Sequence, residues 1–371
     1  MKKSSLIPLF SIVFVDMLGF GFIIPIIPFI ALNYGLNPFM IGILLSTYPF
    51  GQAIGAAVIG RLSDRFGRKP LLLLSITGTF LSLLLLGFSR TVVLIFVSRL
   101  LDGLTGGNIS VAQSYITDLT DEQNRAKGLG LIGAAFGLGF IFGPAIGGYL
   151  SQFGYQVPAF FSAGLAFINI FLVIFMLPES LTKEHMAELK NNPKAKFSLK
   201  VLLETLKEPI VGPLLHSRVY YALAFAIFQT IFALYVQKKL NLDAKSAGFI
   251  LAYVGVLVVF VQGVIIGPIT KKYSEKRLMI VSSAVLAIGF LGWALSPSLV
   301  FLLIVLIPIS FSSGVLNTVL RSALTKSVAK EKIGGILGLS TSLESITSII
   351  APLLGGFLMG NVGLYAPGIF S

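Results

Sequence analysis

Long runs of apolar residues, separated by short polar or charged breaks, make up most of this chain. A helix needs about 20 mostly apolar residues to cross ~30 Å of hydrocarbon. Eleven runs reach that length, and a twelfth begins near Leu364 but stops at Ser371, about a dozen residues short of a crossing. We therefore predict an all-α polytopic membrane protein with a truncated twelfth helix. The eleven predicted spans are residues 6–32, 39–60, 70–88, 91–117, 128–150, 157–177, 211–237, 246–269, 277–296, 299–321 and 333–358.

The composition agrees with this pattern and excludes several kinds of chemistry. Hydrophobic residues make up 55% of the 371 positions and charged residues 12%, against about 25% charged in soluble domains. Without cysteine, and with two histidines, the chain has no disulfide and no thiolate or histidine-cluster metal site. We expect no cofactor. A membrane enzyme or sensor is the least favoured class, because we find no paired nucleophile and base and no appended soluble domain.

The formal charge of +13 raises the choice between a nucleic-acid partner and a lipid partner. Basic loops resist translocation and stay cytoplasmic, and 22 of the 28 Lys and Arg fall on one side of the predicted spans. This placement favours the bilayer over nucleic acid and predicts a multi-pass protein of the plasma (inner) membrane with its amino terminus in the cytoplasm. The basic residues on that side are Lys2, Lys3, Arg61, Arg65, Arg68, Lys69, Arg125, Lys127, the six lysines from Lys183 to Lys207, Lys271, Lys272, Lys276, Arg277, Arg321, Lys326, Lys330 and Lys332.

The longest break between spans divides the chain into halves. It predicts a bundle of six helices over residues 1–178, a cytoplasmic linker over 179–208 and a second bundle over 209–371 whose last helix is incomplete. Within the linker, residues 197–207 form either an amphipathic helix on the inner membrane surface or part of a solvated connection.

The two halves resemble each other at an offset of about 207 residues, which indicates duplication of a six-span unit. Gly143–Gly148 matches Ala351–Gly356, and Gly60–Pro70 aligns with Gly267–Arg277. The second copy of this loop has Lys271 where the first has Asp64.

Four motifs resemble those of the major facilitator superfamily, and most closely its drug:proton antiporters of the tetracycline-resistance type. Gly60–Pro70, with the sequence GRLSDRFGRKP, is similar to the superfamily's loop motif between its second and third helices. Asp16–Pro28 resembles the first-helix motif of the antiporter group, and Arg99–Gly103 resembles its fourth-helix motif. Glycines and a proline in the fifth span follow the antiporter motif there. The resemblance covers Phe10 to about Gly356.

This resemblance implies two six-helix bundles around a cavity that opens alternately to each side of the membrane. It also implies a monomer that exchanges protons for a small amphipathic molecule. The alternative is a symporter that imports a sugar or another metabolite on the same scaffold. The tetracycline exporters carry further ionisable residues in their second half, whereas spans 246–269 and 277–296 here contain no acid and no histidine. Tetracycline itself is therefore not favoured as the substrate.

The loop motif and its neighbours form the predicted conformational switch, which comprises Gly60, Asp64, Arg65, Gly67, Arg68 and Asp118. In the family's inward-closed geometry, Asp64 would meet the free N–H groups at the start of the eleventh helix, at 333–335. Arg68 is positioned to pair with Asp118. Because Lys271 replaces Asp64 in the second copy, we expect the first half to dominate this latch. The alternative is that the basic residues only set topology.

Three of the fifteen acids lie within spans, each near the predicted midplane: Asp16, Asp102 and Glu344. Such residues are costly in hydrocarbon and face water or a partner. Arg99 and Asp102, three apart on one helix, are expected to pair, so Asp102 is either a proton-coupling residue or a structural partner of Arg99. Asp16 has no basic neighbour on its helix, so we predict it as the proton carrier, with Arg99 stabilising its ionised form. Glu344 replaces Phe136 of the other half. It is either a second proton site, a ligand for a cationic substrate, or a residue satisfied by nearby hydroxyls.

Two further groups complete the candidate site. Gly139, Gly143, Pro144, Gly147 and Gly148 allow close helix packing, and in the antiporters that they resemble this stretch forms a bend that seals one conformation. Polar and aromatic residues within spans could line the substrate cavity or form interhelical hydrogen bonds: Tyr48, Gln52, Asn108, Gln113, Gln229, Gln262 and Asn317.

Overall fold

The computed structural model describes residues 6–120, 122–182, 184, 186, 202, 204–329 and 332–371, and those residues form an all-helical protein. Eleven helical stretches in this part of the chain are long and apolar enough to cross a membrane. This confirms the predicted spans. Helices are the expected solution because every backbone N–H and C=O in hydrocarbon must find a partner within its own segment. Most of the segment 197–207 lies outside the described residues.

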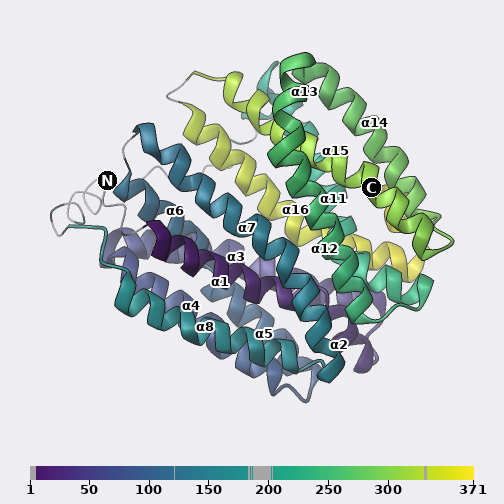
Figure 1. The fold of residues 1–371 in the computed structure, drawn as a ribbon, viewed down its shortest axis with the longest axis horizontal. Helices are drawn as coiled ribbons and strands as arrows, with labels where there is room; N and C mark the ends of the chain where they lie inside the picture. The colour runs from purple at the N-terminus through teal and green to yellow at the C-terminus, as the bar shows by residue number, and fades with distance from the viewer. Residues whose placement is uncertain are drawn as a thin grey trace. The chain divides into compact units, whose positions relative to one another are not determined.

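The chain folds into two compact units, and the first consists of Met1–Gly35, Thr47–Ala195 and Ala244–Ala252. In this unit α1 packs along α7 and α8, and α4 packs along α8 and α5 (Figure 1). Its helices are α1 (Leu6–Ile23), α2 (Ile27–Asn33), most of α3 (Pro38–Phe66), α4 (Arg68–Gly87), α5 (Val92–Thr105), α6 (Asn108–Leu119), α7 (Glu122–Leu150), η2 (Ser151–Phe153), α8 (Val157–Met176) and the start of α12 (Ala244–Phe260).

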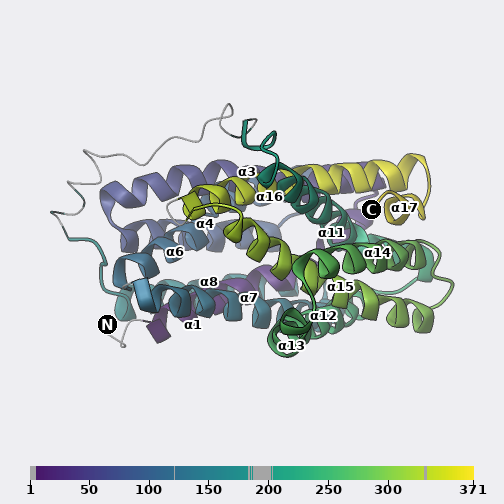
Figure 2. The same cartoon turned by 90° about the horizontal axis from the view of Figure 1, so that it is seen from above.

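The second unit consists of Leu36–Ser46, Lys196–Asp243 and Tyr253–Ser371. Within it α11 packs along α16, while α14 packs along α15 and against α17 (Figure 2). Its core is aromatic: Trp293 is fully buried and makes edge contacts with Phe228 and Tyr235. The helices are α11 (Val211–Leu240), the rest of α12, η3 (Val261–Ile265), α13 (Ile266–Lys272), α14 (Glu275–Ala294), α15 (Leu299–Lys326), α16 (Ile333–Asn361) and α17 (Ala366–Phe370).

The fourth predicted span is two helices, whereas the apolar pattern suggested one. α5 ends at Thr105 and α6 begins at Asn108, with Gly106 and Gly107 between them. Ser75 of α4 supports this break, because its hydroxyl accepts a hydrogen bond from the Gly107 N–H at 3.2 Å and donates one to the Thr105 carbonyl. A break at membrane depth is tolerated only where such partners satisfy the freed backbone groups. The first span is likewise divided into α1 and α2.

Candidate functional site

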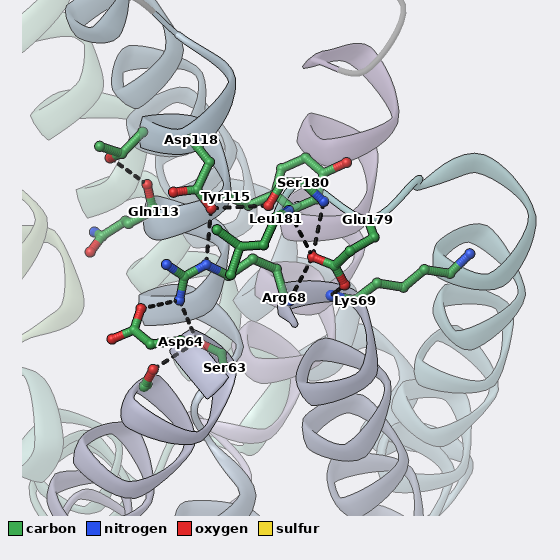
Figure 3. Close-up of polar contacts among 12 residues, drawn as sticks. Ser63, Asp64, Arg68, Lys69, Gln113, Tyr115, Asp118, Glu179, Ser180 and Leu181 are labelled. Carbon is green, nitrogen blue, oxygen red and sulfur yellow. Dashed lines mark hydrogen bonds and ion pairs between the residues drawn. The ribbon is translucent and has the colours of Figure 1, made fainter. Parts of the chain in front are cut away.

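The loop between α3 and α4 turns on Gly67, whose backbone φ of 99° lies in a region that favours glycine. A side chain at this position would also collide, because a Cβ there would lie 2.5 Å from the Glu179 carboxylate. The turn places the next residue, Arg68, at the first position of α4. Its side chain points back toward Ser63 and Asp64 (Figure 3). The turn at Gly67 thus determines where the Arg68 guanidinium lies.

Arg68 is 2% exposed, and its side chain contacts three other side chains. We call the group around it the loop network, which comprises Ser63, Asp64, Arg68, Asp118 and Glu179. The guanidinium lies 2.7 Å from the Asp64 carboxylate and 3.0 Å from that of Asp118, and it donates to the Ser63 hydroxyl at 2.6 Å (Figure 3). The expected pairing of Arg68 with Asp118 is therefore present. One buried cation between two carboxylates holds the end of α3, the start of α4 and the end of α6 together.

Glu179, at the end of the sixth span, contributes to this network although sequence reasoning placed it in the linker. Its carboxylate accepts the backbone N–H groups of Arg68 at 2.8 Å and Lys69 at 3.0 Å, which caps the start of α4 (Figure 3). It also accepts the N–H groups of Ser180 and Leu181. The Ser180 hydroxyl donates to Asp118 at 3.0 Å. The residues after α8 are thereby fixed to the loop.

The remaining predicted switch residues lie at the edge of this network. The Gly60 carbonyl accepts a hydrogen bond from the Ser63 hydroxyl, and the Arg65 side chain is exposed. Asp64 pairs with Arg68 in this structure. The contact expected between Asp64 and residues 333–335 would join the two units and stays a prediction.

A second group of polar residues surrounds a cavity inside the first unit, called the first-half cavity below. Asp16, Tyr48, Arg99, Asp102 and Asn108 all contribute to its lining. Its volume, about 30 Å³, exceeds the ~10–15 Å³ that one water occupies and is far below the ~300–1,000 Å³ of drug-sized pockets. The cavity therefore suits a proton and water, not a drug.

The break in the fourth span sets the geometry of this cavity. Asn108 is the first residue of α6, and its side-chain amide donates to the Asp16 carboxylate at 2.5 Å. Before the break, Arg99 and Asp102 pair on α5 at 3.2 Å, as expected. Both are buried, and the Arg99 Nη2 has no hydrogen-bond partner among the described residues. An N–H group of this guanidinium is thus available to a further acceptor.

The glycines of the predicted bend pack α7 against α1. A Cβ on Gly139 would lie 2.6 Å from the Met17 side chain, and one on Gly143 would lie 2.6 Å from the Cα of Gly21. A Cβ on Gly147 would lie 2.4 Å from the Phe22 carbonyl. These distances leave no room for side chains, so close packing is established for this stretch. Pro144 lies within α7.

Gly148 makes a different contact, with the start of α12 inside the same unit. A Cβ on Gly248 would lie 2.2 Å from the Pro144 carbonyl and 3.0 Å from the Cα of Gly148. The second unit repeats this arrangement, because a Cβ on Gly42 would lie 2.3 Å from the Pro352 carbonyl and 3.2 Å from Gly356. The repeat agrees with the duplication read from the sequence.

Glu344 lies in a charged group of the second unit that sequence reasoning described only in part. Its carboxylate accepts from the Arg218 Nε at 2.8 Å and the Ser340 hydroxyl at 3.2 Å, and it lies 3.5 Å from the Arg321 guanidinium. Arg218 also donates to the Asn317 side chain at 2.9 Å. Ser340 was among the expected partners. The two arginines were not, although an arginine within a span is itself a signal.

The other predicted cavity residues are dispersed. Gln52 donates to the Tyr48 hydroxyl at 3.0 Å beside the first-half cavity. Gln113 is exposed, whereas Gln229 and Gln262 are partly buried. Gln262 lies within the π-helical turn η3.

Known proteins resemble this chain in sequence and in architecture. The chain matches the Major Facilitator Superfamily over residues 9–352. It is 31% identical to the class H tetracycline resistance protein of Pasteurella multocida, over 99% of this chain and 92% of that protein. It is 30% identical to multidrug resistance protein 2 of Bacillus subtilis, over 100% and 92%. The crystal structure of a bacterial homologue of the human lysosomal transporter Spinster, in an inward-facing and occupied conformation, superposes with a TM-score of 0.80 at 14% identity, over 96% and 81%.

The family match, together with this all-helical fold, places the chain in the class of secondary membrane transporters. The chain belongs to the major facilitator superfamily. It is accordingly a multi-pass membrane transporter of small molecules and not an enzyme.

Proposed function

We propose that this protein is a proton-coupled exporter that exchanges protons for small amphipathic drugs or metabolites by alternating access. The observation that carries the proposal is the first-half cavity, where Asp16 lies close to the Arg99 and Asp102 pair in a space of water size. With both carboxylates ionised, this group has an excess of one negative charge within the membrane. Such a charge is costly in hydrocarbon, and binding a proton neutralises it.

Four residues supply the chemistry of proton exchange in this proposal. Asp16 takes the proton, and Asn108 orients its carboxylate through the 2.5 Å hydrogen bond. Asp102 holds the Arg99 guanidinium in place through their ion pair. When Asp16 releases its proton, the Arg99 N–H that has no partner among the described residues offers the new carboxylate a charged donor. A second proton site was one of the three alternatives for Glu344, and its two arginine neighbours favour a different role.

The loop network serves as the conformational switch in this proposal. Arg68 holds Asp64 and Asp118 together in the present arrangement, and loss of either ion pair would free the loop. The predicted second partner of Asp64 is the start of α16. We also propose the predicted topology: two bundles over 1–178 and 209–371, the linker 179–208, and a cytoplasmic amino terminus in the plasma membrane. The one-sided distribution of Lys and Arg supports that orientation.

Two observations support a small amphipathic drug or metabolite as the exported substrate. The relatives at about 30% identity are named tetracycline and multidrug resistance proteins, and the glycine-rich packing of α7 against α1 matches the antiporter motif. The alternative is a symporter that imports a sugar or another metabolite.

Proteoliposomes with an imposed pH gradient separate these two functions. Antiport predicts that adding an amphipathic substrate on one side drives proton movement in the opposite direction, whereas co-directional movement would establish symport. Asp16→Asn should abolish gradient-driven transport while retaining substrate counterflow, which needs no net proton movement. Asp243→Asn removes a carboxylate from an exposed position between α11 and α12 and is the matched control. Full gradient-driven transport by Asp16→Asn would exclude Asp16 as the proton carrier.

A further inference from the structure

A charged group of the second unit carries an excess positive charge. Arg218 on α11 and Arg321 on α15 both face the single carboxylate of Glu344 on α16. Among the described residues of this group, two guanidinium groups against one carboxylate leave an excess of one positive charge. The described lining of the first-half cavity has the opposite excess, since it holds the carboxylates of Asp16 and Asp102 and the guanidinium of Arg99. The two halves of a duplicated scaffold have thus acquired sites of opposite sign.

The depth of Glu344 and Arg218 makes a charge on either residue expensive without a partner. Glu344 lies eleven residues into α16, which begins at Ile333, so it is ~16 Å from that end at 1.5 Å per residue. Arg218 lies seven residues into α11, or ~10 Å from its start. Arg321 lies five residues before the end of α15, or ~8 Å. One ion pair would tie two of these helices together, so helix packing alone gives no reason for a second arginine. Ionisable residues at such depth usually face a water-filled space or a ligand.

The two arginines differ in burial and in how many hydrogen bonds their guanidinium groups donate. Arg218 is 3% exposed and donates to both Glu344 and Asn317. Arg321 has a side chain that is 57% exposed, and its contact with Glu344 is long, at 3.5 Å. Arg218 therefore acts as the fixed base of the group. Arg321 keeps more of its side chain accessible, and the planar fork of an arginine fits a carboxylate or phosphate.

An aromatic surface lies next to the charges. The Arg218 guanidinium lies 5.5 Å from the centre of the Tyr221 ring, and Tyr221 stacks on Phe225 at 6.0 Å. The Tyr221 hydroxyl is held by Ser313 of α15 at 2.8 Å. Tyr221 and Phe225 are both partly buried. A charged group beside an apolar ring is the combination that an amphipathic organic anion requires.

From these contacts we infer that Arg321, Arg218, Asn317 and Tyr221 form a binding site for the carboxylate of an amphipathic organic anion. In this site Arg321 binds the anionic group directly, Arg218 and Asn317 form its base, and Tyr221 lies beside the apolar part. Glu344 is the counter-ion that holds both guanidinium groups in place until the ligand arrives. This inference deepens the proposed function and rests on it, because it assigns a substrate class to the proposed exporter.

The same contacts argue against Glu344 as a ligand for a cationic substrate. Both of its carboxylate oxygens already face an arginine, so an approaching cation would meet a net positive field. The anion site also differs from the proton site by position, since its residues belong to the second unit and Asp16 to the first. The two sites can therefore be tested separately.

The test is equilibrium binding to the purified full chain in detergent, without any gradient. Carboxyfluorescein is the anionic probe and rhodamine 6G the cationic probe, each followed by fluorescence polarisation. We expect Arg321→Gln to weaken carboxyfluorescein binding about tenfold or more, as loss of a charge-assisted hydrogen bond does, and to leave rhodamine 6G binding unchanged. Glu344→Gln should bind carboxyfluorescein more tightly, because the competing carboxylate loses its charge.

Lys239→Gln is the matched control, since it also removes one positive charge from the unit but at the exposed far end of α11. Equal weakening by Lys239→Gln and Arg321→Gln would overturn the site in favour of a general charge effect. Absence of carboxyfluorescein binding to the unmodified chain, or tighter binding of rhodamine 6G that Glu344→Gln abolishes, would also overturn it. If anion binding follows Arg321 and proton exchange in proteoliposomes fails, the site stands and the antiport proposal falls.

Discussion

Glu275 and Lys326 form an ion pair of 2.7 Å between the start of α14 and the end of α15. At the offset of 207 to 208 residues between the halves, Glu275 corresponds to Arg68 and Lys326 to Asp118. The second half thus retains an ion pair at the same place with the two charges exchanged. The sequence comparison, which saw Lys271 in place of Asp64, predicted a latch dominated by the first half and did not recognise this pair.

Restoring the polarity of the first half should test whether the second pair matters. Glu275→Arg alone places two cations together and should lower the transport rate, while Glu275→Arg combined with Lys326→Asp should recover it. The effect should be modest, because Lys326 is 69% exposed and exposed pairs contribute ~0–1 kcal/mol. Transport normalised to the amount of membrane-inserted protein is the measurement. No recovery in the double variant would mean that the pair has no role of its own.

Arg68 should matter far more than Lys326. Arg68→Gln leaves two carboxylates facing each other in a nearly buried site, and breaking a buried ion pair costs about 3–5 kcal/mol. We expect a clear fall in the unfolding temperature in detergent and loss of transport. Arg61→Gln, at an exposed position of the same loop, is the control. An unfolding temperature equal to that of the control would contradict the central position given to Arg68.

Glu179 should stabilise the start of α4 through its carboxylate. Glu179→Ala removes the acceptor for the N–H groups of Arg68 and Lys69, and loss of a helix cap costs about 0.5–2 kcal/mol. Hydrogen exchange of these two amides should therefore quicken, together with that of Leu181. Glu184→Ala, an exposed glutamate a few residues later, should change none of them. Unaltered exchange in Glu179→Ala would show that other groups protect this turn.

Gly143 should tolerate no side chain, because its neighbour across the helix contact is backbone. A Cβ on Gly143 would lie 2.6 Å from the Cα of Gly21, so α1 and α7 would have to separate, at about 1–3 kcal/mol. Gly143→Ala should lower the unfolding temperature in detergent. Gly133→Ala, where a Cβ would meet nothing within 4 Å, should preserve it or raise it slightly. Equal unfolding temperatures for the two variants would contradict the close packing.

The membrane spans could be predicted because lipid imposes one solution on any long apolar segment. Hydropathy averages over many residues, however, and so it did not reveal the breaks at residues 24–26 and 106–107. The paired glycines at 106 and 107 were a visible signal. The partner that makes the break possible, Ser75, lies on another span and could not be inferred from local sequence.

The charged residues show a similar limit. Pairs on one helix, such as Arg99 and Asp102, follow from spacing alone. Arg68, which Glu179 caps, and Arg218, which pairs with Glu344, lie more than 100 residues from these carboxylates, where spacing gives no information. The motif resemblance identified Arg68 and Asp118 because it carried three-dimensional knowledge that this sequence by itself lacks.

Glu179 gives the chain after α8 two attachments instead of one. The first is covalent, through Leu177 and Pro178 to the end of the sixth span, and the second runs through its carboxylate to the first amides of α4. The segment after α8 is therefore attached both to α8 and to the start of α4. Part of any tension applied to the chain beyond Leu181 is transmitted through Glu179 to the first amides of α4. It would therefore act on the turn that positions Arg68.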